Sequence, residues 1–276
     1  MDSDLYPHRG FMLDTGRKFF PVHAILDLLN VLHQHNFNVF HWHIYDAESF
    51  PIHWPTHIGL TDTSMLHSHT SKCYTFGDIQ TVIAHAQRLE ILVYPETDMP
   101  GHCDIWGLWK RGLVVGSPDL KRPQAQLDIR QRQTYDHIFN LTKDDNKLFD
   151  SFQHWLKSLL PNKSLILWDD PLTDEEKNVN ISKDWIIQTW HNGVTQDIIN
   201  RGHGVIVTES DTFYIGNADY DKLLSFKFPD DPNVPGFELA WFTSEGDNPN
   251  DFHQSWVTDP IKAASQIRRH RKQYRD

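Results

Sequence analysis

Acidic, histidine and aromatic residues in this 276-residue chain gather directly after the stretches that the hydrophobic pattern predicts to be strands. The first three of these stretches are followed or ended by Asp14, Arg17, His41, Trp42, His43, Asp46, Glu96, Asp98 and His102, and the later ones by Trp168, Asp169, Asp170, Trp190, His191, Glu209, Asp211, Tyr214, Glu238 and Trp241. Carboxylates and imidazoles transfer protons, whereas aromatic walls with a few polar groups suit a sugar ring. The pattern therefore favours a polar pocket that binds a carbohydrate; the alternative is that the tryptophans only pack in the core.

Some of these residues have other interpretations. A carboxylate at a strand end often only caps the next helix, which applies to Asp169, Asp170 and Asp211. His41 and His43 lie two apart, so on a strand they point to one face and can chelate a metal; a metal-dependent barrel hydrolase is therefore an alternative. No carboxylate or histidine recurs at a comparably clear ligand spacing on the later strands. We therefore expect neither a metal nor a cofactor.

The elements that must position these residues alternate between strands and helices. Strands are predicted at 11–15, 38–46, 91–98, 164–170, 184–190, 204–210 and 236–242, and helices at 21–36, 75–90, 132–139, 147–160, 195–202 and 260–272. The segment from Met99 to Asp128, which carries Pro and Gly, is predicted to be a functional loop. The helical period predicts one apolar face on each of the first two helices, made of Ile25, Leu28, Leu29 and Leu32 and of Ile79, Val82, Ile83 and Ala86. Repeated alternation predicts a parallel sheet, either a closed barrel or a doubly wound sheet. No glycine-rich phosphate loop follows the first strand, which favours the barrel. In that fold the chemistry lies at the carboxyl ends of the strands.

One strand is missing from this alternation. The predicted helices at 132–139 and 147–160 are separated only by NLTKDDN, whereas a closed barrel of this type needs eight strands. The fold class is therefore α/β, a TIM-type (β/α)₈ barrel that is incomplete, with seven strands in one domain over 1–276. The strands ending at Asp98 and starting at Ser164 must then pair across the gap or leave two exposed edges, which favours a homo-oligomer.

Composition limits the partners. The formal net charge of −11 and the lack of a long Lys/Arg run argue against nucleic acid and anionic membranes. No apolar run approaches the ~18 residues of a membrane span, and no secretory signal opens the chain. The pairing of the two cysteines, Cys73 and Cys103, stays open. Glycosylation sequons at Asn140, Asn162 and Asn180 favour the secretory route.

Three separated motifs resemble one known family. HRGFMLDTGRKFFPV, NVFHWHIYDAESFP and VYPETDMPGH are similar, in order and spacing, to the catalytic barrel of glycoside hydrolase family 20, the β-N-acetylhexosaminidases. The likeness continues more loosely through LILWDD, IIQTW and FYIG, and begins at Pro7-His8-Arg9-Gly10, so the family's small N-terminal α+β domain is expected to be absent. The resemblance implies removal of terminal β-linked N-acetylhexosamine by a substrate-assisted retaining mechanism. It also implies a secreted or lysosomal/vacuolar protein.

The resemblance assigns roles to matching residues. Asp46 and His102 would form a supporting catalytic network with His43 nearby, and Arg9 would bind sugar hydroxyls with its fixed charged fork. The remaining substrate-binding positions are Trp168, Trp190 and Trp241 as walls, Tyr214 on the acetamido carbonyl, and Glu238 on sugar hydroxyls, although the spacing from Glu238 to Trp241 differs from the family's. The expected partners are glycans ending in N-acetylglucosamine or N-acetylgalactosamine, or chitooligosaccharides.

The family's acid pair is absent from this sequence. Family members carry a strand ending in His-x-Gly-Gly-Asp-Glu between the two helices that match 131–139 and 147–160; that Asp orients the acetamido group and that Glu is the general acid/base. Here the junction segment IFNLTKDDNKLF (138–149) stands in its place, which indicates a deletion near 139–147. Asp144 and Asp145 are the nearest acids, and we expect them to cap the second helix. We therefore expect impaired activity; the alternatives are an inactive sugar-binding protein and an incomplete gene product.

Overall fold

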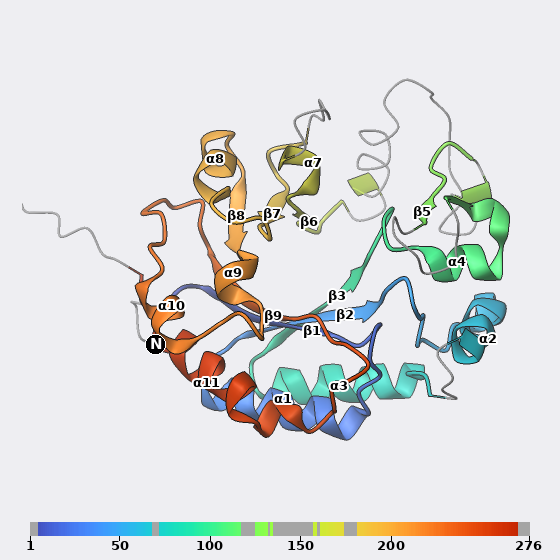
Figure 1. Cartoon of the computed structure of the whole chain (residues 1–276), viewed down its shortest axis with the longest axis horizontal. Helices are drawn as coiled ribbons and strands as arrows, with labels where there is room; N and C mark the ends of the chain where they lie inside the picture. The colour runs from blue at the N-terminus through green and yellow to red at the C-terminus, as the bar shows by residue number, and fades with distance from the viewer. Residues whose placement is uncertain are drawn as a thin grey trace, which may run out of the picture.

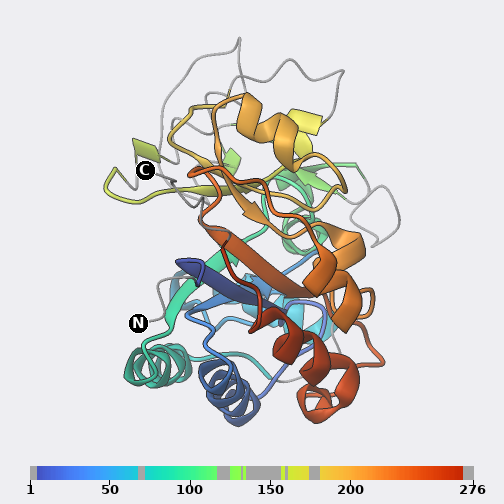
Figure 2. The same cartoon turned by 90° about the vertical axis from the view of Figure 1, so that its left-hand side faces the viewer.

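The fold is a seven-stranded parallel sheet that curls into a half barrel (Figures 1 and 2). The computed structural model describes residues 5–67, 72–116, 125–131, 133–134, 157–158, 161–173 and 181–269. The strands are β1 His8–Asp14, β2 Val39–Tyr45, β3 Leu92–Thr97, β6 Ile166–Trp168, β7 Ile186–Gln188, β8 Gly204–Val207 and β9 Gly236–Trp241. Their order is β3-β2-β1-β9-β8-β7-β6, and every pairing is parallel. The predicted incomplete barrel is confirmed, and a doubly wound sheet is excluded.

Strands β3 and β6 form the two ends of the sheet. Within the described residues β3 pairs only with β2, and β6 only with β7, so the half barrel has two edges there. Leu92 at the start of β3 is 63% exposed. The chain between these two strands contains the junction segment, which lies outside the described residues, as do most of the helices predicted at 132–139 and 147–160.

Helices α1 (Val22–Gln34), α3 (Phe76–Arg88) and α11 (Ser255–Ala264) cover one face of the first three strands and β9 (Figures 1 and 2). The apolar face predicted for α1, Ile25, Leu28, Leu29 and Leu32, is buried. On α3 only Val82 and Ala86 are buried, and Ile83 is 37% exposed. Ile79 is partly buried against the core, so of the apolar stripe predicted for this helix only Ile83 is exposed; α3 lies at the end of the sheet, beside the edge strand β3.

The long segment from Met99 to Asp128, predicted to be a functional loop, contains short elements in its described part. They are α4 Asp104–Trp109, η2 Arg111–Leu113, and an antiparallel pair of β4 Val114–Val115 and β5 Gln126–Leu127. The other elements are η1 Pro55–His57, α2 Ile58–His67, α7 Asp170–Thr173, α8 Thr195–Asn200, α9 Ser210–Phe213, α10 Tyr220–Ser225 and η3 Asp251–His253. None of the described helices has the length and apolar character that a membrane span requires.

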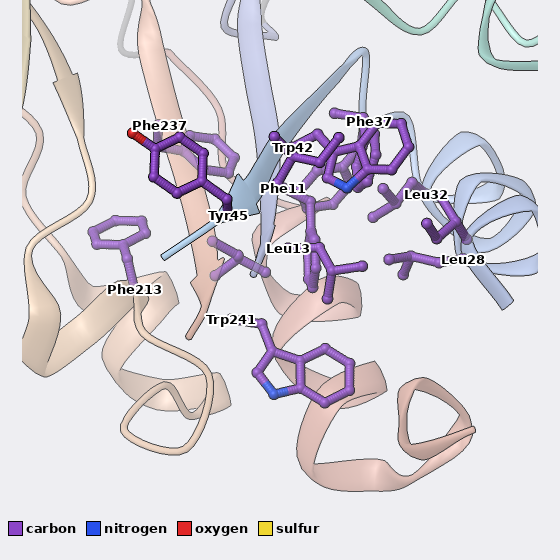
Figure 3. Packing of buried hydrophobic residues seen from close by; sticks show 14 of the residues in the cluster. Phe11, Leu13, Leu28, Leu32, Phe37, Trp42, Tyr45, Phe213, Phe237 and Trp241 are labelled. Atoms are coloured by element: carbon purple, nitrogen blue, oxygen red, sulfur yellow. The ribbon is translucent and has the colours of Figure 1, made fainter. Parts of the chain in front are cut away.

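Strand alternation separates the core from the interior of the half barrel. Successive strand residues point to opposite faces. Phe11, Leu13, Trp42, Phe237 and Trp241 therefore join the apolar core that packs against the helices (Figure 3). The residues that alternate with them, which include His41, His43 and Glu238, point to the opposite face. There His41 contacts Glu238, and His43 contacts Glu96. The register places Asp14 beside His43, and His43 beside Glu96, so the polar groups at the carboxyl ends meet.

Candidate active site

A buried series of alternating carboxylates and imidazoles runs through the interior of the half barrel. His41 bridges Glu238 and Glu96, with both nitrogen–oxygen distances at 2.9 Å. His43 then bridges Glu96, at 2.7 Å from Nδ1, and Asp46, at 2.9 Å from Nε2. These five residues, which we call the acid–imidazole chain, come from β2, β3, β9 and the turn after β2. The arrangement connects the middle of the sheet to the carboxyl ends of its strands, the region around Asp46 that we call the opening.

Opposite charges stabilise one another along the acid–imidazole chain. Burial alone would lower the pKa of His41, but the neighbouring Glu238 and Glu96 carboxylates raise it to about 9. The pKa of His43 is likewise raised well above its usual value, because Glu96 and Asp14 outweigh the effect of burial. The imidazolium charges in turn hold the pKa values of Glu96 and Glu238 below the usual range, against burial. At neutral pH the series therefore holds charged acids and charged imidazoles.

Asp46 is the point where this series reaches the opening. The Arg17 guanidinium lies 2.7 Å from Asp46 Oδ2 and 2.7 Å from Asp14 Oδ2. His102 Nδ1 lies 3.1 Å from Asp46 Oδ1, within the hydrogen-bonding range expected from the sequence. Burial would raise the pKa of Asp46, but the hydrogen bonds from His102 and His43 and the charge of Arg17 lower it. Asp46 is thus an ionised group with a fixed orientation; its catalytic role stays a prediction.

Aromatic rings surround the opening next to Asp46. The indole N–H of Trp168 donates to Glu96 Oε1 at 2.6 Å. The ring of Phe242 lies 6.0 Å from that of Trp168 and 5.0 Å from that of Tyr214, and the Arg17 guanidinium carbon lies 5.2 Å from its centroid. The structure therefore brings Trp168 and Tyr214 together with Arg17 through Phe242. Apolar ring faces beside charged hydrogen-bonding groups are what a sugar ring needs.

Trp190 lies just after the carboxyl end of β7. Its indole N–H donates to Asp170 Oδ2 at 3.0 Å. Asp170 is the first residue of α7, directly after β6. Trp190 thus stands on the same side of the opening as Trp168, at the carboxyl ends of the neighbouring strands β6 and β7.

Arg9 does not reach the opening. It is the second residue of β1, and its side chain donates to the carbonyl oxygens of Asn36, at 2.6 Å, and Tyr6. Tyr214 lies at the carboxyl end, where it bridges Ala240, so the expected meeting of Arg9 and Tyr214 is corrected. The guanidinium at the opening is that of Arg17, which lies in the same sequence motif. Its position three residues after Asp14, where β1 ends, is the sequence signal that could have pointed to it.

Trp241 and Glu238 also lie elsewhere than expected. Trp241 is 1% exposed, and its ring packs 5.4 Å from that of Phe20 in the core rather than in the pocket wall. Because strand residues alternate, the next residue, Phe242, faces the opening instead. Glu238 is fully buried within the half barrel, and its oxygens contact His8, His41, Tyr94 and Gln188. Neither side chain is placed to contact a sugar.

Three overlapping groups of side chains at the opening have ligand atoms close enough for a metal ion. They are Asp14, His43 and Asp46; His43, Glu96 and Asp98; and Asp46, Asp98 and His102, each with its ligand atoms within 4.8 Å of one another. Arg17 already neutralises Asp14 and Asp46, while both nitrogens of His43 are occupied by Glu96 and Asp46. The donor set is therefore engaged within the protein, and the expectation of no metal remains a prediction.

Comparison with known proteins gives one family. The sequence model described as "Glycosyl hydrolase family 20, catalytic domain" matches residues 6–157 and 124–227. Beta-hexosaminidase subunit A1 of Dictyostelium discoideum is 29% identical over 274 residues, which cover 83% of this chain and 50% of that protein. A beta-hexosaminidase of Emericella nidulans is 25% identical over 304 residues, covering 87% of this chain and 50% of that protein. The chain thus spans about half the length of these curated relatives.

Comparison with solved structures gives proteins of the same kind. The crystal structure of a beta-N-acetylhexosaminidase from Bacteroides fragilis superposes with a TM-score of 0.81 at 18% sequence identity, over 97% of this chain and 67% of that one. At such identity the likeness concerns the fold alone, and it agrees with the parallel half barrel described above. Since the family's sequence model covers most of the chain, the protein belongs to glycosyl hydrolase family 20 and corresponds to its catalytic domain.

Proposed function

We propose that the opening at Asp46 binds the terminal β-linked N-acetylhexosamine of a glycan, and that hydrolysis of the glycosidic bond is impaired. The observation that carries the proposal is the position of Asp46, whose carboxylate is held between Arg17, His43 and His102. This ionised cluster lies beside the rings of Trp168 and Phe242. N-acetylglucosamine or N-acetylgalactosamine glycans and chitooligosaccharides have the hydroxyls and apolar ring faces that fit such a pocket.

Each group would have a distinct task in the substrate-assisted reaction. The acetamido oxygen of the substrate attacks the anomeric carbon, the glycosidic bond breaks, and the leaving oxygen takes a proton from a general acid. Arg17 would bind sugar hydroxyls, and Trp168 and Phe242 would pack on the ring. The Tyr214 hydroxyl has no hydrogen-bond partner in the described part of the chain, so it is available to donate to the acetamido carbonyl. Asp46 and His102 would orient the acid.

The acids that the structure describes near the opening are poor substitutes for the missing one. Glu96 and Glu238 have lowered pKa values and are paired with imidazoles, so they hold no proton to donate at neutral pH. Glu209 accepts from Thr195 Oγ1 at 2.6 Å, away from Asp46. Asp98 retains a proton more readily, because burial and Glu96 raise its pKa to about 7. It extends from β3 rather than from the strand that carries the family's acid, and a misplacement of ~1 Å can cost about 10²-fold in rate.

Two features of the comparisons support a lost segment. The family's sequence model matches in two parts that meet and overlap within 124–157, the region that contains the junction segment. The alignment with the Emericella nidulans relative extends over 304 positions, more than the 276 residues of this chain, so the relative has residues without a counterpart here. Loss of a positioned general acid costs on the order of 10²–10⁴ in rate. An inactive sugar-binding protein and an incomplete gene product are the two alternatives.

Calorimetric titration with N-acetylglucosamine tests the binding part of this proposal. We expect N-acetylglucosamine to bind, and Asp46→Asn to weaken that binding about tenfold or more, because an ionised acceptor is lost. The control is Asp197→Asn, on the exposed side of α8, which should bind as the unchanged protein does. Failure of the unchanged protein to bind any N-acetylhexosamine would exclude the sugar site. Genomic sequence around the codons for 139–147 distinguishes an incomplete gene product from the other two cases.

Location and assembly are part of the proposal. The sequons at Asn140, Asn162 and Asn180 support a secreted or lysosomal/vacuolar glycoprotein, and Asn162 lies exposed before β6. The two edges of the half barrel, at β3 and β6, support a homo-oligomer, because unpaired strand edges favour association. Treatment of secreted protein with an N-glycosidase, followed by mass measurement, tests the first. Light scattering coupled to size-exclusion chromatography tests the second.

A further inference from the structure

Two buried carboxylates hold the loop between β7 and α8, residues 189–194. From the β6 side, Asp169 accepts from the backbone N–H groups of Trp190, at 3.3 Å, and His191, at 3.2 Å. From the β8 side, Glu209 accepts from the Gly193 N–H at 3.0 Å and from Thr195 Oγ1 at 2.6 Å. Each carboxylate thus comes from a strand that neighbours β7 in the sheet. The loop is held on both sides, which keeps the side chains it carries in one orientation.

Asp169 does more than cap a helix. Its Oδ1 lies 2.9 Å from Nδ1 of His191, on the next strand's loop, and its side chain is completely buried. A carboxylate accepts hydrogen bonds, so Nδ1 of His191 carries a proton, and in the neutral imidazole Nε2 is then an acceptor. Within the described residues, both contacts of this imidazole, from Asp169 and Thr173, are at Nδ1. Nε2 is therefore available to a ligand.

The imidazole of His191 is also fixed by an aromatic neighbour. Its centroid lies 3.8 Å from a ring centroid of Trp190, and the Trp190 N–H is held by Asp170. Two consecutive carboxylates, Asp169-Asp170, thus bind two consecutive rings, Trp190-His191, and the two rings pack on each other. Pre-organised groups of this kind bind a ligand without the entropic cost of ordering side chains.

His191 is more exposed than the charged groups around Asp46. The side chain of Asp46 is fully buried, that of Arg17 is 21% exposed, and that of His191 is 38% exposed. Asp169 directly follows Trp168, whose ring contacts Phe242 at the opening. His191 therefore lies nearer the surface than the charged groups at Asp46, at the carboxyl end of the strand that pairs with the one carrying Trp168. In the proposal below, a terminal sugar beside Trp168 brings the second sugar of the glycan to this more exposed position.

We propose that His191 is a specificity-determining residue for the second sugar of the bound glycan, and that Asp169 is its positioning residue. Nε2 of His191 accepts a hydrogen bond from a hydroxyl of that sugar, and Asp169 fixes the tautomer and the ring plane. The proposal rests on the proposed function, since it needs a terminal N-acetylhexosamine in the pocket.

The test compares two probes, N-acetylglucosamine and its β-1,4-linked disaccharide, by calorimetry at neutral pH. In His191→Ala the disaccharide should bind about tenfold more weakly, whereas the affinity for the monosaccharide should change by less than about twofold. In Asp169→Asn the disaccharide should also bind about tenfold more weakly, because the imidazole loses its fixed tautomer. Asp197→Asn on α8 is the matched control and should alter neither affinity. A ¹⁵N NMR measurement of the imidazole should find the proton on Nδ1 in the unchanged protein and a mixture of tautomers in Asp169→Asn.

The outcomes separate the two proposals. If the unchanged protein binds neither probe, the sugar site fails and this inference fails with it. If it binds both, but His191→Ala weakens monosaccharide and disaccharide equally, the sugar site stands and the assignment to the second sugar is overturned. A proton on Nε2 of His191 in the unchanged protein would likewise overturn the positioning role of Asp169, whatever the affinities.

Discussion

Arg17, three residues after the end of β1, contacts Asp46, directly after the end of β2, with a guanidinium nitrogen 2.7 Å from Asp46 Oδ2. The same guanidinium contacts Asp14 at 2.7 Å, so one cation balances two buried carboxylates. Arg9, in the same motif, is bonded to backbone carbonyls at the other end of β1. Under the proposed function, the arginine of this motif that binds the sugar is therefore the one at the carboxyl end of the strand.

Substitution of the two arginines should therefore have different effects. Arg17→Lys keeps a positive charge but loses the planar fork that contacts both acids, so we expect N-acetylglucosamine to bind about tenfold or more weakly. Arg9→Lys should leave the affinity within about twofold. Calorimetric titration of both variants measures this difference. A loss of affinity in Arg9→Lys but not in Arg17→Lys would mean that Arg9, not Arg17, binds the sugar.

Substitution of Phe242 should weaken sugar binding, whereas substitution of Trp241 should lower the stability of the fold. Phe242→Ala removes a ring that lies between Trp168 and Tyr214, so sugar affinity should fall about tenfold with a small change in stability. Trp241→Ala removes a buried core side chain and should lower the free energy of unfolding by about 3–5 kcal/mol. Urea denaturation and calorimetry on both variants check the assignment. The reverse pattern would return Trp241 to the pocket wall.

Gly10 provides a test of the packing around Glu238. A Cβ atom at Gly10 would lie 2.5 Å from Cγ of Glu238, which is fixed by contacts to His41 and other groups. Gly10→Ala should therefore lower the free energy of unfolding by about 1–3 kcal/mol. Gly112→Ala is the control, because no atom lies within 4 Å of its added Cβ. Equal stability of the two variants in urea would show that Glu238 can move aside.

Much of this fold follows from periodicity, but the site required spatial information. Seven apolar stretches predicted the seven strands, and the apolar face of α1 was read correctly because its pattern is local. The period of two also predicts that His41 and His43 share a face. By contrast, the choice between Trp241 and Phe242 depends on which face of β9 turns inward. The motif resemblance suggested Trp241. In the structure Glu238 points into the half barrel, and because side chains alternate along the strand, Ala240 and Phe242 share that face.

The bonding role of Asp169 was not predictable from sequence for a different reason. A carboxylate that precedes a helix usually caps that helix, and sequence contains no signal for a partner 22 residues away. Only the adjacency of β6 and β7 in the sheet brings His191 to it. The acid–imidazole chain was not predictable for the same reason. Its members belong to β2, β3 and β9 or follow β2, and the sequence does not tell which residues of these strands lie side by side.

Stability should fall at alkaline pH because of the acid–imidazole chain. The folded protein holds the His41 proton with a pKa of about 9, above the ordinary value of 6.5. The resulting stabilisation, roughly 3 kcal/mol, is complete below about pH 6.5 and is lost as the pH rises through about 9. Thermal unfolding measured between pH 6 and pH 10 should show this loss, and His41→Gln should remove most of it. A melting temperature that stays constant to pH 10 would mean that His41 is neutral in the folded protein.

Turnover of 4-nitrophenyl N-acetylglucosaminide tests the central claim most directly, beside the Asp46→Asn variant and with sugar binding measured on the same samples. The account predicts that the protein binds N-acetylglucosamine yet turns over this substrate at a rate far below ~1 per second, the lower end of the usual enzyme range. A turnover of ~1 per second or more that disappears in Asp46→Asn would contradict it, because a general acid would then be present despite the junction segment.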